Sequence, residues 1–234
     1  MSQEEWAGDL ARMIAGEVRR HRQRRGLSAQ QLADACEEAG YPIARSVLAN
    51  FENGRRPTVS VAEVVVLARV LRVPPILLLF PLGQAEMVEI VPGVHTTVWD
   101  AFDWFVGSAP LHWRKDGKPS SPATTTGKDI NVWREEVRPL DLLRENQRYI
   151  RQWRHETEIA AHQRRAVEEA EDEEVRRWRR EAAETHAQIA RQLEYEIART
   201  RKEMRHLGWT AIPSLPDKLD HIDVLMQDGP EEVE

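Results

Sequence analysis

The sequence predicts an all-α protein with a compact bundle of five short helices, a linker and one long C-terminal helix. Three observations lead to this prediction. Apolar residues recur at helical spacing within the first 83 residues. Residues 107–128 are rich in proline, glycine and threonine, a composition typical of flexible linkers. Residues 139–207 contain no glycine and no proline after the first position, so one helix of ~100 Å is expected there at about 1.5 Å per residue.

The composition limits both the architecture and the chemistry. With 41% apolar and 31% charged residues, the 234-residue chain is expected to form a modest core and a long solvated helix. It contains no apolar run long enough to span a membrane, and its acidic start lacks a signal core. The single cysteine, Cys36, cannot form an internal disulfide, and the eight histidines show no ligand spacing. We therefore expect a cytoplasmic protein with no metal, no cofactor and no small-molecule ligand.

Charge is distributed unevenly along the chain, whose net charge is −6. Residues 10–56 carry nine arginines against five acidic residues, whereas residues 84–234 carry 22 basic and 30 acidic side chains. A basic head on an acidic body suits a local nucleic-acid site, although ordinary surface charge can also produce a difference of this size.

The first segment, residues 1–83, contains clear helix start and stop signals. Ser28 with Gln31, and Ser60 with Glu63, have the spacing of capping boxes, and Gly26 suits the end of a first helix. Cys36 falls at an inward helical position, where a small buried hydrophobe is favoured over a redox sensor. The expected helices cover residues 5–25, 28 to the break at 40–42, 44–53, 60 to at least 71, and 76–80.

The third of these helices has two different faces. Ala44, Leu48 and Phe51 share one side, which is expected to pack inward. The other side carries short, mostly polar residues: Arg45, Ser46, Ala49 and Asn50. Arginine can pair with guanine and asparagine with adenine in the major groove of DNA. These four residues are therefore the candidate base-reading residues, although a bundle used only for protein contact is the alternative.

Residues at the end of this helix are candidates for phosphate binding. Asn53, Arg55 and Arg56 follow the outward face directly. Contacts from such positions would fix the docking register on a duplex.

Several short motifs within residues 10–81 carry a family resemblance. They are the Gly26-Leu27-Ser28 opening, the Leu32-Ala33 pair, Glu52-Asn53-Gly54 and the LARVLRVPP stretch. Together they resemble the lambda-repressor-like helix-turn-helix regulators, also called XRE or Cro type. The RRPTVSVAE and PPILLLFP stretches resemble versions found in actinobacteria and their phages. The resemblance implies a five-helix fold and double-stranded DNA binding by a transcriptional regulator, with a phage-type immunity repressor as one refinement.

The resemblance also implies roles for individual residues. The base-reading positions of the family fall on Arg45, Ser46, Ala49 and Asn50, and its phosphate-binding asparagine falls on Asn53. Its DNA-contacting glutamine is replaced by Ala29, so Gln30 is the substitute phosphate contact. The family further implies a structural ion pair between Arg22 and Glu52. The stretch from 33 to 43 is longer than usual, which can alter the angle of the recognition helix.

The second segment, residues 84–138, gives weaker signals. Residues 87–91 fit a short strand or an extended lead, and residues 97–106 fit a small amphipathic helix that uses Val98, Phe102 and Phe105. The basic linker residues Arg114, Lys115 and Lys118 suit solubility or a DNA-touching arm.

The third segment, residues 139–208, is expected to be a coiled-coil-like helix. Pro139 suits its first position and Gly208 its end. Apolar residues at alternating spacing predict a stripe that binds another copy or a partner protein through 175–207. The stripe consists of Val175, Trp178, Ala182, Thr185, Ile189, Leu193, Ile197, Thr200, Met204 and Leu207. Trp153 and Trp178 are bulky for a tight dimer and can instead pack on another domain. The last segment, 209–234, is expected to be a disordered acidic tail.

These patterns predict a sequence-specific DNA-binding regulator, most simply a repressor associated with the nucleoid. The first alternative is a coiled-coil adaptor that binds proteins. The second is an antitoxin-like regulator that contacts a toxin through residues 84–234. An enzyme is not expected, because the sequence has no glycine-rich phosphate loop, HExxH or GxSxG motif.

Overall fold

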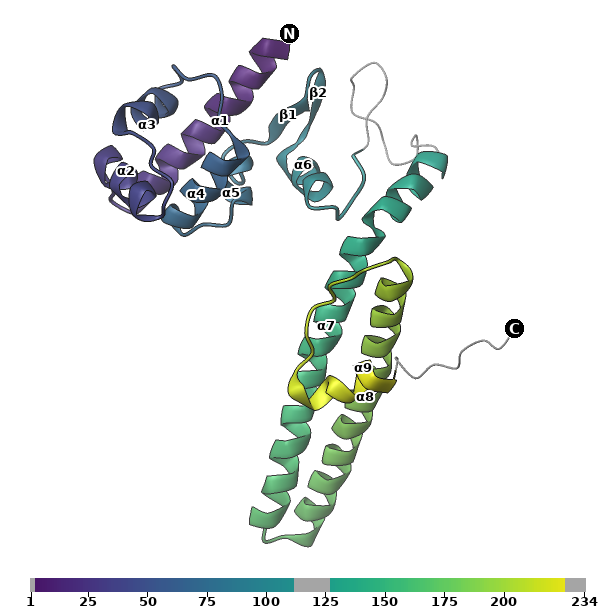
Figure 1. Cartoon of the computed structure of the whole chain (residues 1–234). Coiled ribbons are helices and arrows are strands. Elements are labelled where there is room, and N and C mark those ends of the chain that lie inside the picture. The colour runs from purple at the N-terminus through teal and green to yellow at the C-terminus, as the bar shows by residue number, and fades with distance from the viewer. Residues whose placement is uncertain (1–2, 112–126, 226–234) are drawn as a thin grey trace. The chain divides into compact units, whose positions relative to one another are not determined.

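The computed structural model describes residues 3–111 and 127–225, which are helical apart from one two-stranded hairpin (Figure 1). The chain divides into an N-terminal unit that ends at Asn131 and a C-terminal unit that begins at Val132. No helix in the described ranges is both long enough and apolar enough to cross a bilayer.

The N-terminal unit opens with the predicted bundle. Its helices are α1 (Gln3–Arg24), α2 (Ala29–Glu38), α3 (Arg45–Glu52), α4 (Val61–Leu71) and α5 (Ile76–Leu79). Both predicted capping boxes are confirmed: Ser28 caps α2 with Gln31, and Ser60 caps α4 with Glu63. Gly26 follows α1 with φ of 67°, a conformation that glycine adopts without strain.

A single apolar core holds these helices together. It is formed mainly by Val18, Leu32, Cys36, Leu48, Phe51, Leu67, Leu71 and Leu78, all buried. Cys36 is fully buried, which confirms the prediction of a small buried hydrophobe at this position. Burial also raises the pKa of its thiol. The predicted inward face of α3 is wrong at Ala44, which is the exposed N-cap residue. The half-buried Val47 packs on the core instead.

A small hairpin and helix follow the bundle. Strand β1 (Met87–Val91) pairs antiparallel with β2 (Val94–Thr97), and α6 (Val98–Phe105) begins directly after it. The expected strand at 87–91 is thus confirmed, but its four-residue partner β2 was too short to be predicted. The presence of this hairpin means that the predicted all-α fold class is incomplete. The indole of Trp6 on α1 donates to the carbonyl of Glu89 at 3.1 Å.

The aromatic residues of α6 lie differently from the prediction. Val98 is buried as expected, but Ala101 is buried too and Phe105 is 53% exposed. Phe80 packs edge-on against both Phe102 and Phe105 and joins α6 to the end of the bundle. The basic residues Arg114, Lys115 and Lys118 lie outside the described residues.

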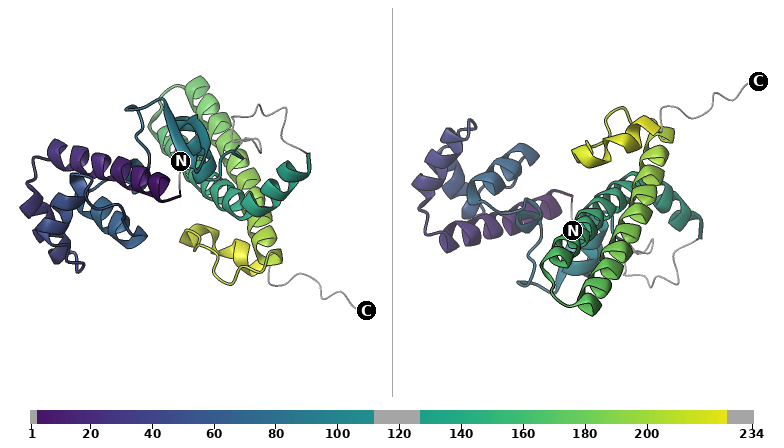
Figure 2. Two further views of the ribbon diagram at one scale, coloured as in Figure 1. Left: turned by 90° about the horizontal axis from the view of Figure 1, so that it is seen from above. Right: turned by 90° about the horizontal axis from the view of Figure 1, so that it is seen from below.

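The C-terminal unit is an antiparallel helical hairpin rather than the single predicted helix. Helices α7 (Gly127–Glu169) and α8 (Glu173–His206) run side by side (Figures 1 and 2). The chain turns just before Asp172, whose carboxylate accepts from the amide of Glu174 at 2.7 Å and caps α8. Pro139 lies inside α7 and not at its first position, which is a second correction.

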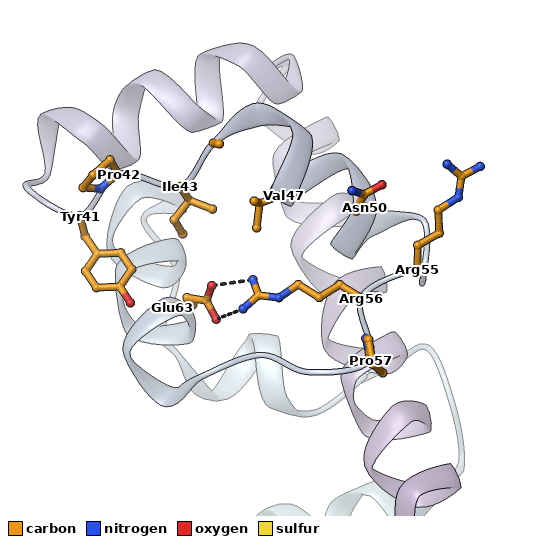
Figure 3. A pocket seen from close by; sticks show the side chains of 10 residues that line it. Tyr41, Pro42, Ile43, Val47, Asn50, Arg55, Arg56, Pro57 and Glu63 are labelled. Carbon is orange, nitrogen blue, oxygen red and sulfur yellow. Dashed lines mark hydrogen bonds and ion pairs between the residues drawn. The ribbon is translucent and has the colours of Figure 1, made fainter.

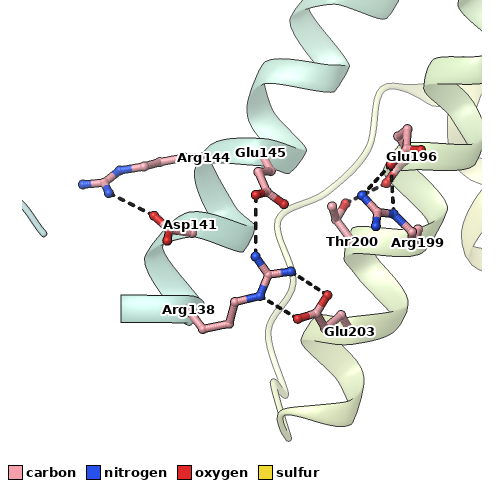
Figure 4. Close-up of polar contacts among 8 residues, drawn as sticks. All are labelled: Arg138, Asp141, Arg144, Glu145, Glu196, Arg199, Thr200 and Glu203. Atoms are coloured by element: carbon pink, nitrogen blue, oxygen red, sulfur yellow. Dashed lines mark hydrogen bonds and ion pairs between the residues drawn. The ribbon is translucent and has the colours of Figure 1, made fainter. Parts of the chain in front are cut away.

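Polar contacts set the register of α7 against α8. Arg138 makes two hydrogen bonds to Glu203, of 2.6 and 2.7 Å, and lies 3.5 Å from Glu145 (Figure 4). Deeper in the hairpin, the amide of the buried Asn146 donates to the Thr200 hydroxyl at 2.8 Å. Such a buried polar pair favours one alignment of two helices over its alternatives.

The predicted apolar stripe on α8 packs partly against α7 of the same chain. Ala183, Ala190, Ile197 and Met204 are buried at seven-residue spacing. In the second half of the predicted stripe, Ile197, Thr200 and Met204 are buried as predicted, but Leu207 is 50% exposed. The first half is displaced by one residue, because Ala183 is buried while Val175, Trp178 and Ile189 are exposed. We call these last three residues the outer stripe.

The segment after Gly208 is not a disordered tail over its described part. It forms η2 (Asp217–Leu219) and α9 (Asp220–Leu225), and Leu219 and Ile222 are buried against α7 and α8. The buried guanidinium of Arg201 donates to the carbonyl of Pro213 at 2.7 Å and to the carboxylate of Asp223 at 2.5 and 2.9 Å. The predicted disorder is wrong for 209–225, while 226–234 lie outside the described residues.

Candidate nucleic-acid interface

Helix α3 presents its polar face to solvent. Leu48 and Phe51 are almost completely buried and fix the opposite side of α3 on the core. Arg45, Ser46 and Asn50 are exposed, whereas Ala49 is half-buried. Within residues 3–111 and 127–225, the exposed three make no side-chain hydrogen bond or ion pair. Their donors and acceptors are therefore free to meet an external partner.

An ion pair ties the end of α3 to α1. Two nitrogens of Arg22 lie 2.6 and 2.5 Å from the two carboxylate oxygens of Glu52, and the third donates to the carbonyl of Leu27 at 2.7 Å. The hydrogen bonds that Arg22 donates to Glu52 raise the pKa of Arg22. Because the Glu52 side chain is only 6% exposed, this pair can hold α3 at a fixed angle to the rest of the bundle.

The predicted phosphate-binding side chains differ in whether they already have hydrogen-bond partners within the chain. Asn53 and Arg55 are exposed, and no other described residue engages their side chains. Gln30 is exposed, but its amide donates to Asp34 at 2.7 Å. Arg56 is bound to Glu63 by two hydrogen bonds of 2.6 and 3.0 Å. Of the four predicted phosphate contacts, Asn53 and Arg55 are thus the two that can bind phosphate without breaking a contact within the described residues.

Glu63 has two structural roles that its sequence position only partly reveals. Its carboxylate accepts from the amide of Ser60 at 2.8 Å and from Arg56. Burial disfavours the ionised carboxylate, but the hydrogen bonds from Arg56 and Ser60 outweigh it and lower the pKa of Glu63. The capping signal identified Glu63 in the sequence, whereas its pairing with Arg56 was missed.

A cleft of about 830 Å³ lies beside the recognition face (Figure 3). Tyr41, Ile43 and Val47 line one side of it, and Asn50 and Arg55 line the other. The Arg56–Glu63 pair lies between these two groups of side chains (Figure 3). The cleft thus extends the exposed surface of α3 toward both loops that flank this helix.

In the part of the chain that the structure describes, no group of three or more His, Cys, Asp or Glu side chains has a geometry suited to a metal ion. The base-reading candidates are instead brought together on one helix, with the phosphate candidates Asn53 and Arg55 at its end.

Comparison with known proteins identifies one domain. The sequence model of a family described as a helix-turn-helix domain matches residues 14–79, which run from within α1 to the end of α5. No curated protein and no solved structure matches the chain. The match covers the bundle that holds α3 and less than a third of the chain. Residues 14–79 therefore match a helix-turn-helix domain, a class of domain whose usual ligand is DNA.

Proposed function

We propose that this protein is a sequence-specific double-stranded DNA-binding transcriptional regulator that acts as a repressor. One observation carries the proposal: Arg45, Ser46 and Asn50 on the outward side of α3 are exposed, and their side chains are free of internal partners among the described residues. The match to a helix-turn-helix domain supports it. The proposal assigns a binding role, without catalysis or a cofactor.

Base recognition would proceed through α3 in the major groove. The guanidinium of Arg45 would donate to O6 and N7 of a guanine, and the amide of Asn50 would pair with N6 and N7 of an adenine. Ser46 and Ala49 are small enough to let the helix approach the base edges closely. Each good bidentate contact discriminates against the wrong base by about 1–3 kcal/mol.

Backbone contacts would supply much of the affinity. Asn53 and Arg55 lie at the end of α3, where they can hold phosphates on one strand and fix the register. The Arg22–Glu52 pair acts through α3 and positions it. Bound in this way over a promoter, the protein would exclude other proteins from it, which is the physical basis of the proposed repression.

Self-association is a further part of the proposal. The outer stripe on α8 consists of the exposed residues Val175, Trp178 and Ile189, and the side chain of Trp178 is 58% exposed. Pairing of two copies through this stripe would bring two recognition helices to one duplex and raise the avidity. The surface available is shorter than the predicted 175–207 region, because Ile197 and Met204 are already buried within the chain.

The decisive experiment is the genome-wide recovery of DNA bound by the protein in its host, followed by binding measurements on the recovered sites. The wild-type protein should bind these duplexes with an affinity that falls steeply with salt. The double variant Arg45→Ala/Asn50→Ala should lose the preference for the recovered site over a scrambled duplex, while its melting temperature stays near that of wild type. If no duplex is bound and the chain instead captures a protein partner, the adaptor function is favoured.

A further inference from the structure

The connection between α2 and α3, residues 39–44, carries one aromatic residue, Tyr41, on an anchored stretch of backbone. Gly40 has φ of 82°, and the amide of Tyr41 donates to the carbonyl of Cys36 at 3.0 Å. Pro42 follows, and Ile43 is buried in the bundle core. The loop is therefore anchored on both sides of Tyr41, whose conformational freedom is already restricted before any ligand binds.

The side chain of Tyr41 lies outside the core. It is 38% exposed, and its hydroxyl has no hydrogen-bond partner among the described residues. It lines the same cleft as Asn50 and Arg55, on the opposite side (Figure 3). A hydroxyl in this position can donate a hydrogen bond to a group that enters the cleft.

The charges around the cleft suit an anion. Glu63 alone would repel one, but the positive charge of Arg56, which donates two hydrogen bonds to this carboxylate, offsets its negative charge. Arg55 then leaves one net positive charge among the lining residues. The cleft adjoins the recognition face through Asn50, so the anion nearest to it on a bound duplex is the sugar–phosphate backbone.

We infer that Tyr41 is a DNA-backbone ligand, whose hydroxyl donates to a phosphate oxygen of the strand that lies over this cleft. The inference rests on the proposed function and adds a contact from the long α2–α3 loop to those of α3. Because a phosphate contact carries no sequence information, Tyr41 contributes affinity and docking register, and not base preference.

The test compares Tyr41→Phe with wild type on a recovered genomic site and on a scrambled duplex of the same composition. We expect affinity to fall about tenfold on both duplexes, because a hydrogen bond to a charged group is lost. The dependence on salt should keep its slope, since a neutral donor displaces no counterion, whereas Arg55→Ala should reduce the magnitude of the slope by about 0.9. The matched control is Tyr195→Phe, at a 69% exposed tyrosine on α8, which should bind as wild type does.

The outcomes separate this inference from the proposed function. Equal affinities of Tyr41→Phe and wild type on both duplexes overturn the contact but leave the regulator in place. A loss confined to the recovered site also overturns it, because Tyr41 would then read a base. A wild-type protein that binds no duplex at any salt concentration overturns both. Tyr41→Phe removes only an exposed hydroxyl, so its melting temperature should match that of wild type.

Discussion

The carboxylate of Glu52 is nearly inaccessible to solvent, and its two oxygens both face Arg22. Removing one partner of a buried pair leaves the other charge without compensation and costs about 3–5 kcal/mol. Glu52→Ala should therefore lower the melting temperature and the DNA affinity together, because α3 loses its tether to α1. Calorimetry and a binding titration test this, and a melting curve identical to that of wild type would contradict it. Glu37→Ala, at an exposed acidic position on α2, is the control.

A second residue-scale prediction concerns pH. His21 is buried on α1, and burial, followed by the charge of Arg20, lowers its pKa, although Glu17 opposes this and Arg24 adds to it. The folded chain thus favours the neutral ring, so stability is greatest above the ordinary value of about 6.5 and is lost as the pH falls below it. The melting temperature should be lower at pH 5.5 than at pH 7.5. His21→Gln should reduce this difference in melting temperature. An unchanged difference in the variant would show that His21 is not its source.

Residue-level prediction from the sequence succeeded where the signal is local. The Ser28 and Ser60 caps depend on residues three positions away, and both formed. Ala44 was misplaced because helical spacing alone does not reveal that a residue is the N-cap. Arg56 was taken as free because its acceptor lies seven positions along the chain, beyond a loop whose path the sequence does not specify.

At the scale of elements, the C-terminal hairpin depends on one helix cap. Residues 140–207 lack glycine and proline, so the sequence favours continuous helix, yet the chain reverses before α8. Asp172 accepts hydrogen bonds from the amides of Glu174 and Val175, which would otherwise lack partners. Asp172, Glu173 and Glu174 form an acidic run typical of a helix start, but the lack of glycine and proline around it favoured a continuous helix.

Asp172→Ala should therefore destabilise the hairpin by about 1 kcal/mol. Asp172→Ser, which restores an oxygen acceptor, should recover most of the loss, and Glu171→Ala should have little effect. Thermal unfolding followed by circular dichroism is the measurement. If the serine variant were as unstable as the alanine variant, the cap would not be the cause.

At the scale of the whole molecule, the outer stripe is the surface proposed for self-association. Trp178 is 58% exposed, which makes it the main apolar anchor of this surface. Trp178→Glu should shift sedimentation from dimer to monomer and weaken DNA binding at low protein concentration by at least tenfold, because the second recognition helix is lost. The matched control is Trp99→Glu, at a tryptophan of the other unit that is 62% exposed. A wild-type protein that sediments as a monomer at every concentration would contradict this prediction.

The molecule as a whole was predictable only in part, for a physical reason. The motifs of the bundle lie within a short stretch that also matches a known domain, so its fold was predictable although α1 packs on α3, α4 and α5, which do not follow it directly in sequence. The hairpin and the packed segment after Gly208 depend on contacts between residues far apart, such as Ile150 with Leu219. The spacing of apolar residues within one segment does not reveal which distant segment it will pack against.

The anchoring of α9 has a consequence for how the chain can be shortened. Arg201 is 3% exposed, and its guanidinium is satisfied by Pro213 and Asp223, both beyond Gly208. A protease that cuts at this glycine would remove those acceptors and uncover Ile150 and Trp153 at once. The remaining fragment would carry an unpaired cation beside an apolar surface newly exposed to water, so nicked molecules should aggregate or be cleared from the cell faster than intact ones.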